Sequence, residues 1–123
     1  MRFMLDANAL ILLLTGHPAV QARAAECEEG ELALSAIAFA EVALGSQRGK
    51  PPPAEAIDRV LEEIVVLPFD DAAARAYAAL PFRRASFDRL IAAHALATDL
   101  ILVTANHSDF ADVPGLRQQN WAA

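Results

Sequence analysis

Short apolar runs alternate with longer segments of mixed polarity along the chain. The apolar runs occupy residues 2–5, 31–34, 65–67 and 100–103, and a shorter one lies around 116–117, after a Val-Pro-Gly turn. Runs of this length, bounded by turn residues, predict buried strands. The segments between them predict helices over 7–14, 19–28, 36–46, 54–64, 71–80 and 87–99.

The order of these elements predicts the fold class. Strands that alternate with helices indicate an α/β domain, with a mostly parallel central sheet of about four to five strands flanked by helices. In such a sheet the loops beyond the carboxyl ends of the strands form a crevice where ligands bind. Polar residues that directly follow the strands are therefore the first candidates for function.

Composition narrows the class of protein. The chain has 123 residues, of which 55% are hydrophobic and 21% charged, so we expect one domain, residues 1–123, with its own core. The single cysteine, Cys27, cannot form an internal disulfide, and we expect a reducing, cytoplasmic location. No apolar run approaches the roughly 18 residues of a membrane-spanning helix, so no membrane partner is expected.

The charge balance at first argues against a nucleic-acid partner. Ten basic residues stand against sixteen acidic ones, for a formal net charge of −6, whereas nucleic-acid-binding domains usually carry a basic excess. The single lysine, Lys50, lies between Gly49 and Pro51 in an expected loop, which disfavours mechanisms that need a buried lysine. If the protein binds phosphate, some other positive charge must neutralise it.

Two acidic side chains stand out by position. Asp6 directly follows the first strand, where a helix cap is a sufficient explanation, and Asn8 is either a first-turn residue or a donor that orients Asp6. Glu41 shares one helical face with three apolar residues, Ile37, Ala40 and Leu44. This carboxylate therefore belongs to or borders an apolar stripe, where burial is costly without a cation or hydrogen bonds. The alternative is a solvated glutamate on the other side of the helix.

Further candidates lie in the second half of the chain. Asp88 occupies the first turn of its helix, where a favourable interaction with the helix dipole is the simplest explanation. Thr104, Asn106 and Asp109 follow the strand at 100–103, and an Asx turn with a helix cap accounts for each alone. His94 falls on an apolar stripe with Phe87, Leu90 and Ile91. No second histidine or cysteine stands at ligand spacing from it, so we expect a packed histidine and no zinc site.

Together these positions favour a metal site. Three of the elements follow, or begin just after, strands that end in one crevice, and Glu41 comes from a helix packed over it. Carboxylates that converge without basic partners repel one another, and divalent cations remove that repulsion. Oxygen ligands suit Mg²⁺ or Mn²⁺, which take phosphate oxygens and activate water. The pattern favours hydrolysis of a phosphodiester.

Four segments carry a family resemblance that covers essentially the whole chain. They are residues 4–10 (MLDANAL), 35–42 (SAIAFAEV), 87–95 (FDRLIAAHA) and 103–110 (VTANHSDF), and the ending from Val113 to Trp121 is also typical. In this order and spacing the chain resembles PIN-domain nucleases of the VapC type, the toxins of bacterial toxin–antitoxin pairs. No Gly-rich phosphate loop or dinucleotide motif competes with this interpretation.

The resemblance implies a Mg²⁺-dependent endoribonuclease whose acidic residues bind the metal (Mg²⁺ or Mn²⁺). Asp6, Glu41 and Asp88 match the three firm acidic positions, and Thr104 is a supporting hydroxyl. Many PIN domains have an aspartate two residues after the threonine, where this chain has Asn106. Asp109 is then the nearby acid that takes its place, with Asn106 as the alternative ligand.

The resemblance also implies partners. They are an RNA substrate, a cognate antitoxin whose tail enters the acidic crevice, and a second copy of the chain in a homodimer. Arg83, Arg84 and Arg89 flank Asp88 and are candidates for holding RNA phosphates, with solvated arginines or antitoxin contacts as the alternative. Residues 80–86 are shorter than the helix and loop that relatives often carry, a departure that bears on the RNA groove or the dimer contact.

A second function class stays open. A non-catalytic PIN module would bind RNA or a protein partner without cleaving anything, and Asn106 is the residue that favours it. Metal-dependent RNA cleavage distinguishes the two.

Overall fold

The computed structural model describes all 123 residues, and its strands and helices alternate as the sequence predicts. The strands are β1 (Phe3–Leu5), β2 (Leu32–Ser35), β3 (Val65–Leu67), β4 (Ile101–Val103) and β5 (Gln118–Gln119). The helices are α1 (Ala7–Leu14), α2 (Pro18–Ala25), α3 (Ala36–Gln47), α4 (Ala54–Val60), α5 (Asp71–Ala78) and α6 (Phe87–Thr98), with a 3₁₀ helix η1 (His107–Phe110).

The strands form one parallel sheet in the order β3-β2-β1-β4-β5. β1 lies at its centre, where Met4 pairs with Ala33 of β2 and with Leu102 of β4. The strand order runs outward from β1 in both directions, so the crevice beyond β1 and β4 is the topological switch point of the sheet. The predicted α/β class and parallel sheet are confirmed.

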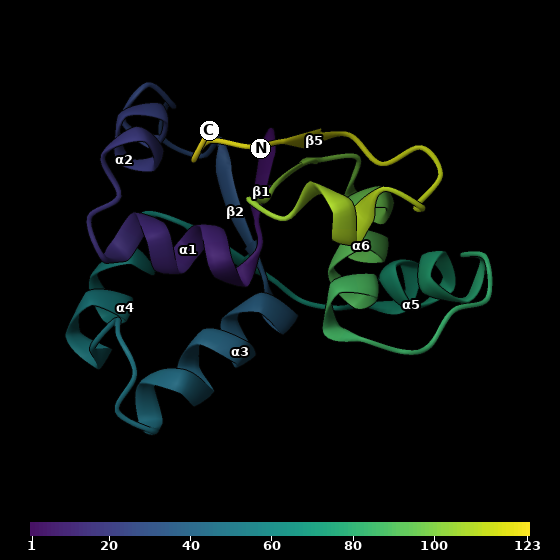
Figure 1. Ribbon diagram of the computed structural model, residues 1–123, viewed down its shortest axis with the longest axis horizontal. Coiled ribbons are helices and arrows are strands. Elements are labelled where there is room, and N and C mark those ends of the chain that lie inside the picture. The colour runs from purple at the N-terminus through teal and green to yellow at the C-terminus, as the bar shows by residue number, and fades with distance from the viewer.

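Helices cover both faces of the sheet (Figure 1). α1, α2 and α4 lie on one side and α5 and α6 on the other, while α3 lies beyond the lower end of the strands in this view. α3 contacts α1 and α4 on the one side and α6 on the other. It therefore closes the end of the sheet at which β1 and β2 terminate.

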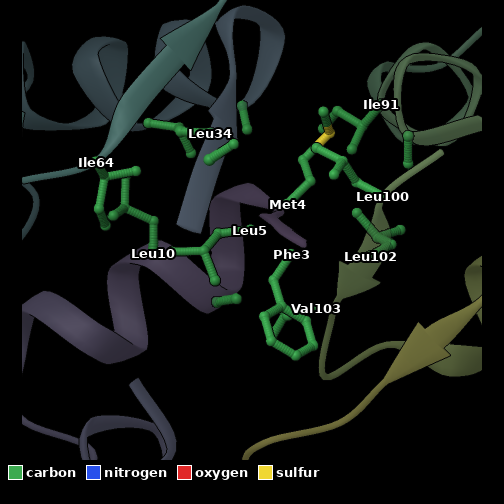
Figure 2. Packing of buried hydrophobic residues seen from close by; sticks show 14 of the residues in the cluster. Phe3, Met4, Leu5, Leu10, Leu34, Ile64, Ile91, Leu100, Leu102 and Val103 are labelled. Atoms are coloured by element: carbon green, nitrogen blue, oxygen red, sulfur yellow. The ribbon is translucent and has the colours of Figure 1, made fainter. Parts of the chain in front are cut away.

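The core lies on both sides of β1, because neighbouring residues of a strand point to opposite faces. Met4 points toward Ile91 and Leu100, whereas Leu5 points toward Leu10 (Figure 2). All three residues of β1 are buried, as are Leu10 of α1 and Ile91 of α6. No helix has the length and apolarity needed to cross a membrane.

Four predicted elements differ from the structure by two residues or more. α5 ends at Ala78 rather than at residue 80. α2 ends at Ala25 rather than at residue 28, and α4 ends at Val60 rather than at residue 64. In both cases the chain must leave the helix and turn before entering a strand whose position is fixed by pairing. The last strand lies at 118–119 rather than 116–117, because Gln118 and Gln119 pair with Leu102 and Val103. Backbone pairing, not side-chain hydrophobicity, places this edge strand.

Candidate active site

Asp6 lies at the switch point, beside Thr104. The parallel register pairs Leu5 with Val103, and the backbone N–H of Asp6 donates to the Val103 carbonyl at 3.1 Å. Asp6 is buried, with 3% of its surface exposed, and its Oδ1 accepts from the Ala9 N–H at 2.7 Å. Thr104 is buried as well, and interaction with its hydroxyl lowers the pKa of Asp6, against the larger opposite effect of burial. The predicted helix cap is therefore present, and it places a carboxylate at the carboxyl end of the central strand.

Asn106 takes part in this arrangement through its backbone. Its N–H donates to Thr104 Oγ1 at 3.0 Å, so the turn after β4 fixes the hydroxyl that lowers the pKa of Asp6. The Asn106 residue itself is exposed, and Asn8 is half-buried in the first turn of α1. The supporting role of Thr104 stays a prediction.

Glu41 enters the same crevice from α3. Ser35 ends β2 and caps α3, its Oγ accepting from the Ile37 N–H at 3.1 Å. Glu41 is half-buried, and its Oε1 is fully buried without a hydrogen-bond partner. Such an oxygen costs free energy unless a ligand satisfies it.

The helical face predicted around Glu41 needs a correction. The buried residues of α3 are Ala38 and Val42, whereas Ala40 and Leu44 of the expected apolar stripe are exposed. α3 is apolar around most of its circumference, so periodicity alone could not select the buried face. Glu41 borders the buried face instead of belonging to it.

Asp88 and Asp109 complete the group from the other side. Ser86 caps α6, its Oγ accepting from the Arg89 N–H at 3.2 Å, and Asp88 lies half-buried in the first turn. Asp109 lies exposed in η1, after β4. Four carboxylates, each from a different part of the fold, thus form a group that we call the acidic cluster: Asp6, Glu41, Asp88 and Asp109.

The members of the acidic cluster lie within range of one another's charge. Burial is the main cause that raises the pKa of Asp6, Glu41 and Asp88 above their ordinary values. Repulsion adds to it: Asp88 and Asp109 act on Asp6, Asp88 and Asp6 act on Glu41, and Asp109 acts on Asp88. None of the structure's ion pairs includes a member of the cluster. The four negative charges therefore have no counter-charge from the chain.

These residues fit a divalent cation. The donors are oxygens, and Glu41 Oε1 is buried without a partner. No group of three or more acidic, histidine or cysteine side chains is arranged to hold a metal ion in this structure. Mg²⁺ commonly binds through one or two carboxylates and keeps several waters, so fewer converging side chains would suffice.

A buried hydrogen bond that the sequence analysis did not find joins α3 to α6. His94 Nδ1 lies 2.9 Å from Ser35 Oγ, and both residues are fully buried. Burial lowers the pKa of His94, against the opposing effects of the nearby Asp70 carboxylate and the Pro68 backbone. Burial thus favours the neutral ring, in which Nδ1 accepts the Ser35 hydroxyl proton. The packed histidine is confirmed, and it ties the helix of Glu41 to that of Asp88.

The three predicted arginines have different surroundings. Arg89 is buried, with Nη1 3.2 Å from Asp112 Oδ2 and Nη2 donating to the Pro81 carbonyl at 2.6 Å. Arg83 Nε lies 3.1 Å from the same Asp112 oxygen. Arg84 is exposed and forms no ion pair. Arg89 and Arg83 thus join the segment around the start of α6 to Asp112, whereas the guanidinium of Arg84 is unpaired.

A broad groove lies away from the acidic cluster. Its volume is about 800 Å³, and it runs between α1, α2 and the segment from α4 to β3. Leu13, Leu14 and Leu32 are among its apolar residues, and four glutamates lie along it: Glu28, Glu29, Glu62 and Glu63. None of the four carboxylates of the acidic cluster lines it.

Comparison with known proteins agrees with the geometry. The family model described as "PIN domain" matches residues 3–116. The chain is 32% identical to the tRNA(fMet)-specific endonuclease VapC of Shigella flexneri, over 99% of each chain. Among solved structures, it resembles VapBC2 from Rickettsia felis bound to a promoter DNA fragment (TM-score 0.86, 26% identity, 98% and 99% coverage). DNA-bound VapBC from Salmonella typhimurium is similar too (TM-score 0.82, 25% identity, 98% of each chain).

Proposed function

The chain belongs to the PIN domain family, in its VapC group, and we propose that it is a divalent-cation-dependent endoribonuclease. The observation that carries the proposal is the acidic cluster, which holds four carboxylates without one basic partner and leaves Glu41 Oε1 unsatisfied. Relatives named as VapC endonucleases and ribonucleases support the activity.

Asp6, Glu41, Asp88 and Asp109 are the residues that would hold Mg²⁺ or Mn²⁺. When bound, the cation supplies Lewis acidity, which neutralises phosphate charge and makes water a better nucleophile. Thr104 and Asn8 would support the set, Thr104 through its hydroxyl, which lowers the pKa of Asp6. Because the pKa values of Asp6, Glu41 and Asp88 are raised, protons compete with the cation, and we expect metal affinity to fall as the pH falls through those raised values.

The chain's own residues set the geometry of the reaction. The Ala9 N–H orients the Asp6 carboxylate, and interaction with the Thr104 hydroxyl favours its charged form. The Ser35–His94 bond fixes α3 against α6, which carry Glu41 and Asp88. The RNA phosphodiester would enter between these elements, where the uncompensated negative charge excludes phosphate until a cation is present.

The partners in this proposal follow from the relatives. The similar solved structures are described as VapBC complexes, two of them bound to DNA. We propose that this chain is likewise the toxin of a toxin–antitoxin pair, restrained by a cognate antitoxin, acting in the cytoplasm as a homodimer. Residues 1–123 would act as one PIN domain.

The test is cleavage of total RNA by the purified protein with Mg²⁺ or Mn²⁺. We expect cleavage that EDTA abolishes and that Asp6→Asn or Asp88→Asn reduces about a hundredfold or more, since each removes an oxygen charge from the cation site. Asp58→Asn, an exposed change on α4, is the matched control and should cleave normally.

RNA sequencing of cells that express wild type or Asp6→Asn extends the test to a protein selective for one RNA. If RNA stays intact in both settings while the protein still binds RNA or a protein partner, the chain is the non-catalytic PIN module instead. Co-purification with the product of a neighbouring reading frame tests the antitoxin.

A further inference from the structure

Two exposed phenylalanine rings lie on the segment that leads into α6 and Asp88. Phe82 is 98% exposed and Phe87 is 59% exposed, although the sequence pattern placed Phe87 on the apolar stripe of α6. The aromatic pairs within the chain are Phe3 with Trp121 and Phe69 with His94, so neither exposed ring has an aromatic partner. We propose that Phe82 and Phe87 form a stacking surface for unpaired bases of the RNA substrate, an inference that rests on the proposed function.

The stacking surface is held in place from both sides of Phe82. Its preceding residue, Pro81, accepts a hydrogen bond from Arg89 at 2.6 Å, and its following residue, Arg83, pairs with Asp112 at 3.1 Å. Arg89 and Arg83 share the same Asp112 oxygen. Because the backbone is anchored before and after it, the Phe82 ring is presented to solvent rather than left on a slack loop.

The anchors also fix the surface beside the acidic cluster. Arg89 directly follows Asp88 in the first turn of α6, and Phe87 directly precedes it. Asp112 lies three residues after Asp109 on the segment that follows β4. Consecutive Cα atoms are about 3.8 Å apart, so Phe87 begins within one residue of a proposed metal ligand. Successive side chains of a helix point in different directions, so this surface would flank the cation site rather than line it.

The local charge suits a nucleic acid. Residues 81–87 contain two arginines and no acid, in a chain whose formal net charge is −6. Arg83 forms an ion pair with Asp112, but Arg84, which lies between the two phenylalanines in sequence, is exposed and unpaired. Aromatic rings next to free arginines are the combination by which proteins hold single-stranded RNA, through stacking on bases and attraction to phosphates.

A second copy of the chain is the competing occupant of these rings. A stable protein interface buries about 1,200–2,000 Å², and two phenylalanine rings of about 150–250 Å² each supply a small part of that. Neither ring belongs to the apolar groove between α1, α2 and α4. The observations therefore favour an RNA base, and a protein contact becomes one outcome of the test.

The test measures binding of an oligoribonucleotide of about twelve nucleotides that carries one 2-aminopurine. Asp6→Asn serves as the background so that the probe stays intact; asparagine still caps α1. We expect quenched 2-aminopurine fluorescence on binding, and a loss of about fivefold to a hundredfold in affinity for Phe82→Ala and for Phe82→Leu. Phe82→Trp should retain affinity, and the same strand in a perfect duplex should bind weakly and show no dependence on Phe82.

Val65→Ala, a change at another exposed apolar residue on β3, is the matched control and should bind normally. Affinity within twofold of the background for Phe82→Ala would overturn the stacking surface, and so would full affinity for Phe82→Leu, which keeps bulk without a π face. A change in solution mass of Phe82→Ala without a change in RNA affinity would assign the rings to a protein interface. Failure of the proposed function is a separate result: the wild type would then leave RNA uncut, while this binding measurement would still report on Phe82.

Discussion

Asp109 and Asp112 lie three residues apart, yet their carboxylates have opposite surroundings. Asp109 belongs to the acidic cluster, where each neighbouring charge is negative and burial raises the pKa of three members. Asp112 lies between two guanidinium groups, 3.1 Å from Arg83 and 3.2 Å from Arg89. In the second region the charges stabilise the chain; in the first they remain unpaired, which destabilises the chain until a cation binds. The charge of Asp112 thus serves the stability of the fold, whereas the charge of Asp109 is available to a ligand.

We expect the largest loss of stability when Arg89, which pairs with Asp112, is replaced. Arg89→Ala removes a buried guanidinium and leaves Asp112 and the Pro81 carbonyl with fewer partners, so we expect the free energy of unfolding to fall by about 3 kcal/mol. Urea unfolding measures it. The matched change Arg84→Ala, at an exposed and unpaired residue, should cost under about 0.5 kcal/mol. Equal losses for the two variants would contradict the structural role of Arg89.

The acidic cluster should respond to a cation in the opposite direction. Mg²⁺ at about a hundred times its Kd should stabilise the fold by about 2.7 kcal/mol, because it binds the folded state only. Thermal unfolding with Mg²⁺ and after EDTA measures the shift. Asp88→Asn should lose most of it and Arg84→Ala none. A shift that survives in Asp88→Asn would place the cation elsewhere.

Asp109 and Asn106 are the two candidates for the fourth ligand of the cation, and substitutions distinguish them. Asp109→Asn should lower the cleavage rate about tenfold, since its charge acts on both Asp6 and Asp88. Asn106→Ala should stay within about twofold, because the contact of Asn106 with Thr104 comes from its backbone. Initial rates on total RNA measure both. The reverse order of effects would make Asn106 the ligand.

Glu41 gives the smallest and most specific effect. Its pKa is raised in the folded state, so ionisation penalises folding above that raised value, and the penalty is absent below the ordinary carboxyl pKa. Without metal, Glu41→Gln should therefore raise stability at pH 7.5 by at most about 1 kcal/mol after solvent screening, and by nothing near pH 3.5. Urea unfolding at the two pH values tests it. A gain that is the same at both would implicate packing rather than charge.

Local signals in the sequence predicted much of this molecule. Asp6 caps α1 as its position predicts, because a cap depends on neighbours within three residues. The parallel sheet followed from alternating apolar runs. Signals that depend on distant residues were missed: the Ser35–His94 bond joins residues 59 apart, and Arg89 meets Asp112 from 23 away.

The face of α3 shows the same limit. Nothing in its nearly uniform apolar sequence distinguishes Ala38 and Val42, which are buried, from Leu44, which is 52% exposed. The choice depends on what packs against the helix. The arginines show it too, since Arg83, Arg84 and Arg89 look alike in sequence and differ only through the position of Asp112.

Periodicity and near neighbours along the chain are enough to predict the α/β class, the cap of α1 and the positions of the acidic residues. The tertiary fold sets which charges are paired and which are not. It brought Asp112 to two of the arginines and left the acidic cluster with none, since pairing requires side chains from distant elements to meet within about 4 Å, a distance that no local pattern encodes.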